Sequence, residues 1–269
     1  MKFAQLTYAG SVQSGFKRRT IGALERVTGR DRMVSVYNDW KQNSFGKKHL
    51  VWNDLLKALS LNLDISGANW ERSEVTGQPR VLIANHPYGL ADGVAVLALA
   101  EKLGRPFRIL INDQLLKVPE VRPYALPVQF SRSEEAVKHN AWMKEEAHRL
   151  LREGTTIIIF PGGGVATAKQ PFGVAQELPW RTFAAQLARS EGACVLPVRF
   201  HGQNSWVFQA ASKLSMTFRL ALLVWEFRRS MGRTMKVSLG EPITPDACAR
   251  YGNDKALTEF VKKRVLELR

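Results

Sequence analysis

The stretch VLIANHPYGLADG, residues 81–93, decides how the fold is interpreted. Its first four residues are apolar and have the length of a buried strand. The loop that follows carries Asn85, His86, Pro87 and Gly89. A helix rich in Ala, Val and Leu is then expected to begin at Asp92. Open α/β sheets usually bind ligands where a strand gives way to a loop and a helix, so this stretch predicts both a fold class and the position of a site.

Downstream of this junction, short apolar runs alternate with stretches of helical periodicity. The runs interpreted as strands are residues 80–84, 107–111, 155–160 and 194–200. The stretches interpreted as helices are residues 92–103, 133–152 and 178–190, together with the last sixteen residues. This alternation predicts an α/β sheet flanked by helices. Ser131 and Glu134 have the spacing of a capping box, and Pro179 suits the first turn of its helix.

Residues 1–74 are interpreted as a basic helical N-terminal segment, and residues 75–269 as the α/β body. Within the segment, residues 50–63 place Val51, Leu55 and Leu59 on one stripe, which predicts an amphipathic helix. The first sixty residues carry eleven Lys and Arg against four Asp and Glu. We expect this segment to face an anionic membrane, with the alternative that its apolar stripe packs on the body.

The net charge and the hydropathy of the chain limit which partners and which cellular location we expect for it. The 269 residues carry a formal net charge of +15, and residues 213–236 hold six Lys and Arg against one Glu. An anionic membrane, an acidic carrier protein or nucleic acid would suit this charge, as would a surface that only aids solubility. The beginning of the chain does not resemble a signal peptide, and no apolar run reaches the roughly 18 residues of a membrane span. We therefore expect a peripheral protein that faces the cytosol.

The two cysteines, Cys194 and Cys248, are far apart and lack CxxC spacing. We expect neither a disulfide framework nor a metal site, and we interpret Cys194 as a core residue rather than a nucleophile.

His86 and Asp92 form a candidate catalytic pair. A carboxylate that accepts the Nδ1 proton leaves Nε2 free as a base, and an imidazole with a pKa of about 6.5 suits proton transfer near neutral pH. The alternative is that His86 hydrogen-bonds a turn while Asp92 caps the helix. Their spacing alone does not separate these two interpretations.

Four stretches, in order, resemble the motifs of the lysophospholipid acyltransferases, in particular the bacterial branch of hemolysin-like and lyso-ornithine-lipid acyltransferases. NHPYGLADG, residues 85–93, is similar to the first motif of that branch, and PVQFSRSEEA, residues 127–136, to the second. IIIFPGGGVAT, residues 157–167, resembles the third motif, Phe-Pro-x-Gly after a buried strand. CVLPVRFHGQNS, residues 194–205, resembles the fourth. The resemblance covers roughly residues 75–245.

The resemblance implies a glycerolipid acyltransferase-like fold with a central mixed sheet. It also implies transfer of a fatty acyl group from acyl carrier protein or coenzyme A to the hydroxyl of a lysolipid, at the cytoplasmic face of the inner membrane and with no bound cofactor. His86 would be the general base, and Asp92 would fix its tautomer. The substrate-binding residues implied by the motifs are Asn85, Gly89, Phe130, Ser131, Arg132, Pro161, Gly162, Gly163 and Gly164.

The third motif departs from the usual pattern of that family. Its members usually carry a Glu there and often a basic residue shortly beyond, whereas this chain has Gly162 to Gly164, and the nearest cation is Lys169. Glycine N–H groups could approach an oxyanion closely, and Arg132 is the candidate for an anionic head group. The alternatives are a catalytically weak lipid-binding protein of the same fold and a basic nucleic-acid-binding protein.

Overall fold

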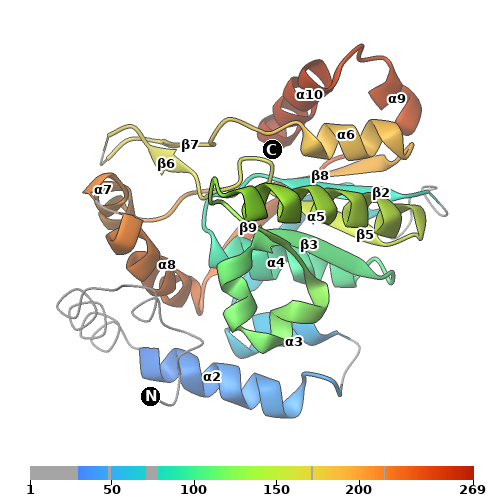
Figure 1. Cartoon of the computed structure of the whole chain (residues 1–269). Helices are drawn as coiled ribbons and strands as arrows, with labels where there is room; N and C mark the ends of the chain where they lie inside the picture. The colour runs from blue at the N-terminus through green and yellow to red at the C-terminus, as the bar shows by residue number, and fades with distance from the viewer. Residues whose placement is uncertain (1–29, 48–49, 71–77, 171, 215) are drawn as a thin grey trace.

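The computed structural model describes residues 30–47, 50–70, 78–170, 172–214 and 216–269 (Figure 1). Within these ranges, a seven-stranded sheet has the strand order β1-β9-β8-β2-β5-β3-β4. Its strands are β1 (Asn62–Gly67), β2 (Arg80–Ala84), β3 (Phe107–Asn112), β4 (Ala125–Val128), β5 (Thr156–Ile159), β8 (Cys194–Phe200) and β9 (Thr234–Leu239). The predicted α/β class is confirmed, and all four strands expected from the sequence are present.

The strand directions make the sheet mixed, as expected. The five strands from β8 to β4 pair in parallel, so their carboxyl ends share one edge of the sheet. Strand β9 is antiparallel to β8, and β1 pairs in parallel with β9. Because β2 and β5 are neighbours in the middle of the sheet, the loops that follow them lie side by side at the centre of that edge.

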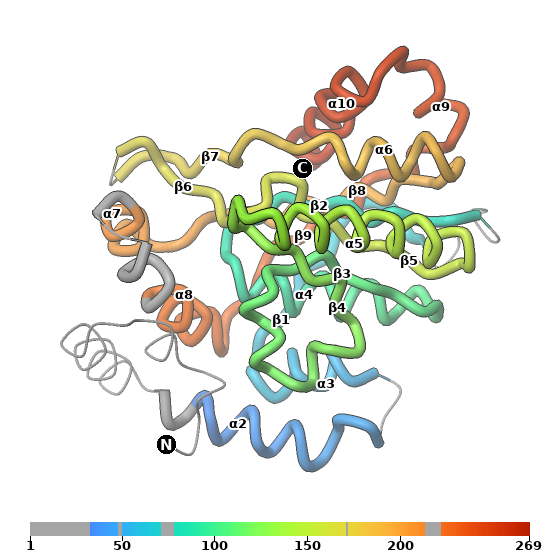
Figure 2. The backbone as a smooth tube through the Cα atoms, in the orientation of Figure 1, coloured from blue at the N-terminus to red at the C-terminus, as the bar shows by residue number. Residues whose placement is uncertain are grey.

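Helices cover both faces of the sheet (Figures 1 and 2). In β2, Leu82 and Ala84 face the core that includes α3 and α4, whereas Val81 and Ile83 face the core that includes α5, α6 and α10. Because both faces are covered, every position of this strand is buried. The helices around the sheet are α2 (Arg30–Asn43), α3 (Val51–Ala58), α4 (Leu90–Glu101), α5 (Glu134–Arg152), α6 (Phe183–Ser190), α9 (Pro245–Ala249) and α10 (Asp254–Glu267), with short 3-10 helices η4 (Asp113–Lys117) and η5 (Pro119–Tyr124).

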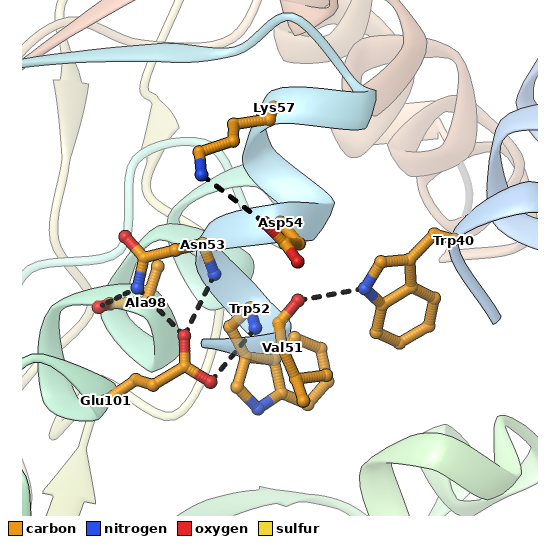
Figure 3. Close-up of polar contacts among 8 residues, drawn as sticks. All are labelled: Trp40, Val51, Trp52, Asn53, Asp54, Lys57, Ala98 and Glu101. Atoms are coloured by element: carbon orange, nitrogen blue, oxygen red, sulfur yellow. Dashed lines mark hydrogen bonds and ion pairs between the residues drawn. The ribbon is translucent and has the colours of Figure 1, made fainter. Parts of the chain in front are cut away.

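A polar network fixes α3 against α4 (Figure 3). The carboxylate of Glu101 accepts hydrogen bonds from the backbone N–H groups of Trp52, at 3.1 Å, and Asn53, at 3.0 Å. It thereby caps the first turn of α3, where N–H groups have no partner within the helix. The indole of Trp40, on α2, donates to the carbonyl of Val51 at 2.8 Å. These contacts join both N-terminal helices to the body.

The apolar stripe of α3 is buried against the body. Val51, Leu55 and Leu59 are 3–8% exposed and belong to the same core as α4. These side chains are therefore not available to a bilayer, which matches the alternative that the sequence left open. The expectation that this helix extends to residue 63 is wrong: it ends at Ala58, and residues 62–67 pair with β9 as β1, an edge strand of the main sheet. Residues 1–29, the first part of the expected basic segment, lie outside the described residues.

Three other expected boundaries are also wrong. Helix α5 begins at Glu134, and its cap is Ser133, whose Oγ accepts from the N–H of Ala136 at 3.2 Å, so Ser131 does not cap it. Helix α6 begins only at Phe183, beyond the turn that contains Pro179. Helix α4 begins before Asp92, which is its third residue.

The remaining elements lie around the edge of the sheet at which the parallel strands end, which we call the site edge. A short antiparallel hairpin, β6 (Thr167–Ala168) with β7 (Ala175–Gln176), lies beside α7 (Trp206–Leu214), and α8 (Met216–Ser230) packs on α4. The basic stretch 213–236 thus contains α8 and the first part of β9, which the sequence analysis did not predict as a strand. Among the helices that the structure describes, none combines the length and the apolar character needed to cross a membrane.

Candidate active site

His86 and Asp92 lie side by side after β2. Nδ1 of His86 is 2.9 Å from Oδ1 of Asp92. The imidazole is 17% exposed, whereas the carboxylate is 0% exposed. The second carboxylate oxygen accepts a hydrogen bond from the backbone N–H of Tyr88, at 2.7 Å. The two residues paired in the sequence analysis are therefore in contact, with the imidazole partly open to solvent.

Asp92 holds the helix as well as the histidine. It is in the first turn of α4, which has Gly89 at its N-cap, and a carboxylate is stabilised there by unpaired N–H groups and the helix dipole. The interpretation of Asp92 as the N-cap is therefore wrong, because Gly89 takes that position; one oxygen of Asp92 instead holds the turn before the helix, and the other faces the ring. With Nδ1 against the carboxylate, Nε2 is the nitrogen that can accept a proton from a substrate.

The loop after β5 lies against the imidazole. The ring of Phe160 stacks on that of His86, with centroids 4.0 Å apart and planes inclined by 27°. The carbonyl of His86 accepts a hydrogen bond from the N–H of Ala166 at 2.8 Å. The third-motif loop is thus attached to the first-motif loop at both of its ends, and Gly162 to Gly164 lie between these attachments.

Gly163 brings the second and third motifs together. Its backbone is left-handed, with φ +66, and its N–H donates to the carbonyl of Phe160 at 2.9 Å. A Cβ at this position would lie 3.7 Å from the ring of Phe130, which follows β4. Because the N–H of Gly163 is engaged within the turn, a donor to an oxyanion has to come from another N–H group of the loop.

A comparison with protein families shows which family the chain belongs to. The sequence profile of a family described as Acyltransferase matches residues 58–269. The chain belongs to this acyltransferase family. The matched region contains the whole seven-stranded sheet and all the loops described above. No curated protein matches the chain.

Glu177 is a residue of this acyltransferase's site that the sequence analysis missed. Its Oε1 accepts a hydrogen bond from the backbone N–H of His86 at 2.9 Å. Its Oε2 lies 3.4 Å from the position that a Cβ on Gly162 would take. Burial raises the pKa of Glu177 above its ordinary value. The carboxylate therefore bonds to the first-motif loop and lies beside the third-motif loop, in a chain whose third motif has no Glu of its own.

Arg181 supplies a cation beside the same loop. Its backbone N–H donates to the carbonyl of Pro161 at 3.0 Å, and its guanidinium carbon lies 5.7 Å from the centroid of the Phe130 ring. This side chain is exposed, so a bound anion can reach it. The sequence analysis found no cation nearer to the third motif than Lys169, because Arg181 comes from beyond the β6–β7 hairpin.

The second-motif residues Ser131 and Arg132 are exposed at the start of α5. The hydroxyl of Ser131 lies 3.4 Å from that of Ser133, the cap of this helix. The contact of Arg132 with an anionic head group stays a prediction.

Asn85 and Gly89 hold the first-motif loop in place. The side-chain amide of Asn85 donates to the carbonyl of Phe200 at 2.9 Å, and its oxygen accepts from the N–H of Phe200 at 2.7 Å. This pair of bonds joins the ends of β2 and β8. Gly89 has φ +81, and a Cβ there would lie 2.9 Å from a methyl group of Leu223 on α8. Both residues thus have structural roles, and their contacts with substrate stay predictions.

The cysteines of the acyltransferase are unsuited to nucleophilic chemistry. Cys194 and Cys248 are both fully buried. Burial raises the pKa of each thiol to about 11, so the thiolate is disfavoured at neutral pH. The prediction that Cys194 is a core residue is confirmed.

A cavity of about 540 Å³ borders the first-motif loop. Asn85, Pro87 and Glu177 line one side of it, and Arg199 and Lys262 line another. Its volume lies within the range of about 300–1,000 Å³ that is usual for ligand pockets. The site therefore has a neighbouring space large enough for part of a substrate.

Proposed function

We propose that this acyltransferase moves a fatty acyl group from acyl carrier protein or coenzyme A to the hydroxyl of a lysolipid, at the cytoplasmic face of the membrane. The observation that carries the proposal is the His86–Asp92 pair, with a buried carboxylate on Nδ1 and a partly exposed ring. The pair provides a general base but no covalent nucleophile. Direct transfer from the thioester to the acceptor alcohol is the reaction that needs such a base alone.

In the proposed step, Nε2 of His86 takes the proton of the acceptor hydroxyl as its oxygen attacks the thioester carbonyl. The C–O bond forms, and the carbonyl oxygen becomes an oxyanion. The C–S bond then breaks, and the departing thiolate takes the proton from the imidazolium. An ester and a free thiol result, and His86 returns to its starting state. Asp92 keeps the ring oriented and stabilises the imidazolium between the two proton transfers.

The loop after β5 is positioned to stabilise the oxyanion. It contains three consecutive glycines, and the stacking of Phe160 on His86 keeps it beside the base. One hydrogen-bond donor aimed at the developing oxyanion in a site sheltered from water is worth about 2.7–4 kcal/mol of transition-state stabilisation in acyl transfer.

The choice of a lysolipid as acceptor rests on the resemblance of the four motifs and on the cations near the loop. The guanidinium of Arg181, and that of Arg132 near the second motif, could each hold a phosphate or carboxylate with two hydrogen bonds. The charge of +15 also suits acyl carrier protein as donor, because an acidic carrier is attracted to a basic enzyme.

A thiol-release assay tests this proposal. The purified chain is mixed with acyl carrier protein or coenzyme A carrying a long acyl chain, with lysophosphatidic acid or a lyso-aminolipid, and free thiol is recorded over time. We expect release that requires both an acceptor and His86, with acylated lipid as the product. Thiol release without an acceptor would identify a thioesterase instead. No release with any donor and acceptor would favour the lipid-binding alternative.

A further inference from the structure

An exposed apolar tip lies beside the site edge. Phe172 is 82% exposed and Val174 is 81% exposed, both in the connection between β6 and β7. Trp206, the first residue of α7, is 56% exposed, and its ring stacks on that of Phe172 with centroids 5.4 Å apart. Three large apolar side chains that gather in the open are unusual on a soluble surface. We propose that this tip inserts into the surface of a lipid bilayer.

The tip is held by its neighbours. The side-chain carbonyl of Gln209, on α7, accepts from the N–H of Ala168 at 2.8 Å, which attaches β6 to that helix. The amide of Gln203 bonds to the other arm, because its oxygen accepts from the N–H of Ala175 at 2.7 Å and its nitrogen donates to the carbonyl of Gly173 at 3.1 Å. Aromatic side chains carried on a fixed hairpin can enter a membrane surface with little loss of conformational entropy.

Both arms of the hairpin lead directly to the site. Ala166, which bonds to the carbonyl of His86, comes just before β6, and Glu177, which accepts from the N–H of His86, comes just after β7. An inserted tip would therefore place the catalytic loop at the membrane surface. This inference rests on the proposed function, because a catalytic loop at the membrane surface serves a reaction whose acceptor is a lipid.

Size and charge favour a bilayer over a protein partner. Aromatic side chains bury about 150–250 Å² each, so Phe172 and Trp206 together offer about 400 Å². A stable protein–protein interface needs about 800 Å² from each partner. Lys169, in the same connection as Phe172, is exposed, and the exposed Arg233 directly precedes β9 at the edge of the sheet where β8 ends. Apolar insertion combined with cations on the same side of a protein is the usual chemistry of peripheral binding to anionic lipid.

Flotation with vesicles tests the proposal without any substrate. The full chain is mixed with phosphatidylcholine vesicles that contain 30% phosphatidylglycerol, and the bound fraction is measured for wild type, for Phe172→Ser/Trp206→Ser and for Trp142→Ser. Trp142 is 57% exposed on α5 and serves as a matched control. We expect at least a tenfold weaker partition coefficient for the double variant and less than a twofold change for the control. Circular dichroism and Tm, together with thiol release on a dispersed short-chain acceptor, should be unchanged in the double variant.

Equal binding of the double variant and wild type would overturn the proposal, and so would an equal loss in Trp142→Ser. A change in oligomeric state of the double variant, with vesicle binding unaffected, would assign the tip to a contact between copies of the chain. Vesicle binding that depends on the tip, in a protein that releases no thiol, would support the membrane contact while contradicting the proposed reaction. The two proposals can therefore fail separately.

Discussion

The two loops at the centre of the sheet edge assemble their chemistry in opposite ways. The loop after β2 carries its own reactive pair, because His86 and Asp92 are six residues apart and a single helix start brings them together. The loop after β5 carries glycines, and its side chains arrive from elsewhere in the chain. Phe130 follows β4, whereas Glu177 and Arg181 follow the β6–β7 hairpin.

The two loops differ in this way because they supply different groups to the proposed reaction. Proton transfer needs two side chains at a fixed distance, and a short loop between a buried strand and a helix sets that distance. Stabilising an oxyanion needs backbone N–H groups, which side chains on the loop itself would obstruct. Charged groups are then provided by neighbouring segments. The first loop should therefore be sensitive to point substitutions in its own sequence, and the second to substitutions in its neighbours.

The largest effect is expected from removing the base. His86→Ala should lower the rate of thiol release at least 100-fold, because general-base catalysis usually contributes about 10²–10⁴-fold. His139→Ala, which removes a histidine of α5 outside the site, is the control and should keep the wild-type rate. Initial rates at saturating donor give the comparison. A folded His86→Ala variant with full activity would remove the basis for the mechanism.

Asp92→Asn should lower the rate about 10–100-fold while the chain stays folded. The Asn oxygen can still accept from the N–H of Tyr88, but its NH₂ group would then face Nδ1 of His86. A donor at Nδ1 favours the tautomer with the proton on Nε2, which cannot act as a base. Tm and the pH profile of the rate provide the measurement. If the rate falls only as far as the stability does, Asp92 acts through the fold alone.

Much of this first loop could be predicted from the sequence, because all its parts are contiguous. The strand, the loop and the helix start occupy thirteen residues, and the expected contact between His86 and Asp92 forms within them. The four buried strands were predictable for a similar reason, since each is a short apolar run. Strand β1 was missed although its sequence, NLDISG, alternates polar and apolar residues, because the helix expected over residues 50–63 overlaps its start.

Glu177 and Arg181 could not be placed from the sequence, because only the folded chain brings them beside the glycines. One signal was present: Glu177 is the single charged residue between positions 170 and 180. A lone carboxylate in an otherwise uncharged stretch is costly to bury without partners, and here the N–H of His86 and the indole of Trp180, at 3.4 Å, provide them.

Glu177→Ala should lower the rate about tenfold, because the backbone N–H of His86 loses its acceptor and the first loop loses its attachment to the segment after β7. Glu177→Gln should recover most of the activity, since a Gln oxygen can accept from the N–H of His86 in the same way. The ratio of kcat to KM in both variants, measured by thiol release, provides the test. A purely electrostatic role for the carboxylate would instead leave Glu177→Gln as impaired as Glu177→Ala.

A smaller effect is expected at the cations. Arg181→Ala should raise KM for an anionic lysolipid several-fold with little change in kcat. The reason is that the guanidinium lies beside the third-motif loop, and none of the contacts described for it involves His86. Arg132→Ala is the parallel variant from the second motif. Comparing the two KM values shows which arginine binds the head group, and unchanged values in both would exclude a head-group role for either side chain.

The smallest effect concerns stability and pH at Glu177. Burial raises the pKa of this carboxyl in the folded chain, so the folded state holds its proton to a higher pH than the unfolded state does. Below the unfolded pKa, near 4.3, both states are protonated and burial of charge costs nothing. As pH rises through the folded pKa, the wild type loses stability, whereas Glu177→Gln has no proton to lose. The Tm of Glu177→Gln relative to wild type should therefore increase between pH 4.5 and pH 8. Glu145→Gln, at an exposed position of α5, controls for the loss of one negative charge and should show no such trend.

A difference in Tm that stays constant with pH would mean that the carboxyl is as well solvated in the folded chain as in the unfolded one. The neighbouring loop would then gain its attachment at Glu177 without any cost from a buried charge.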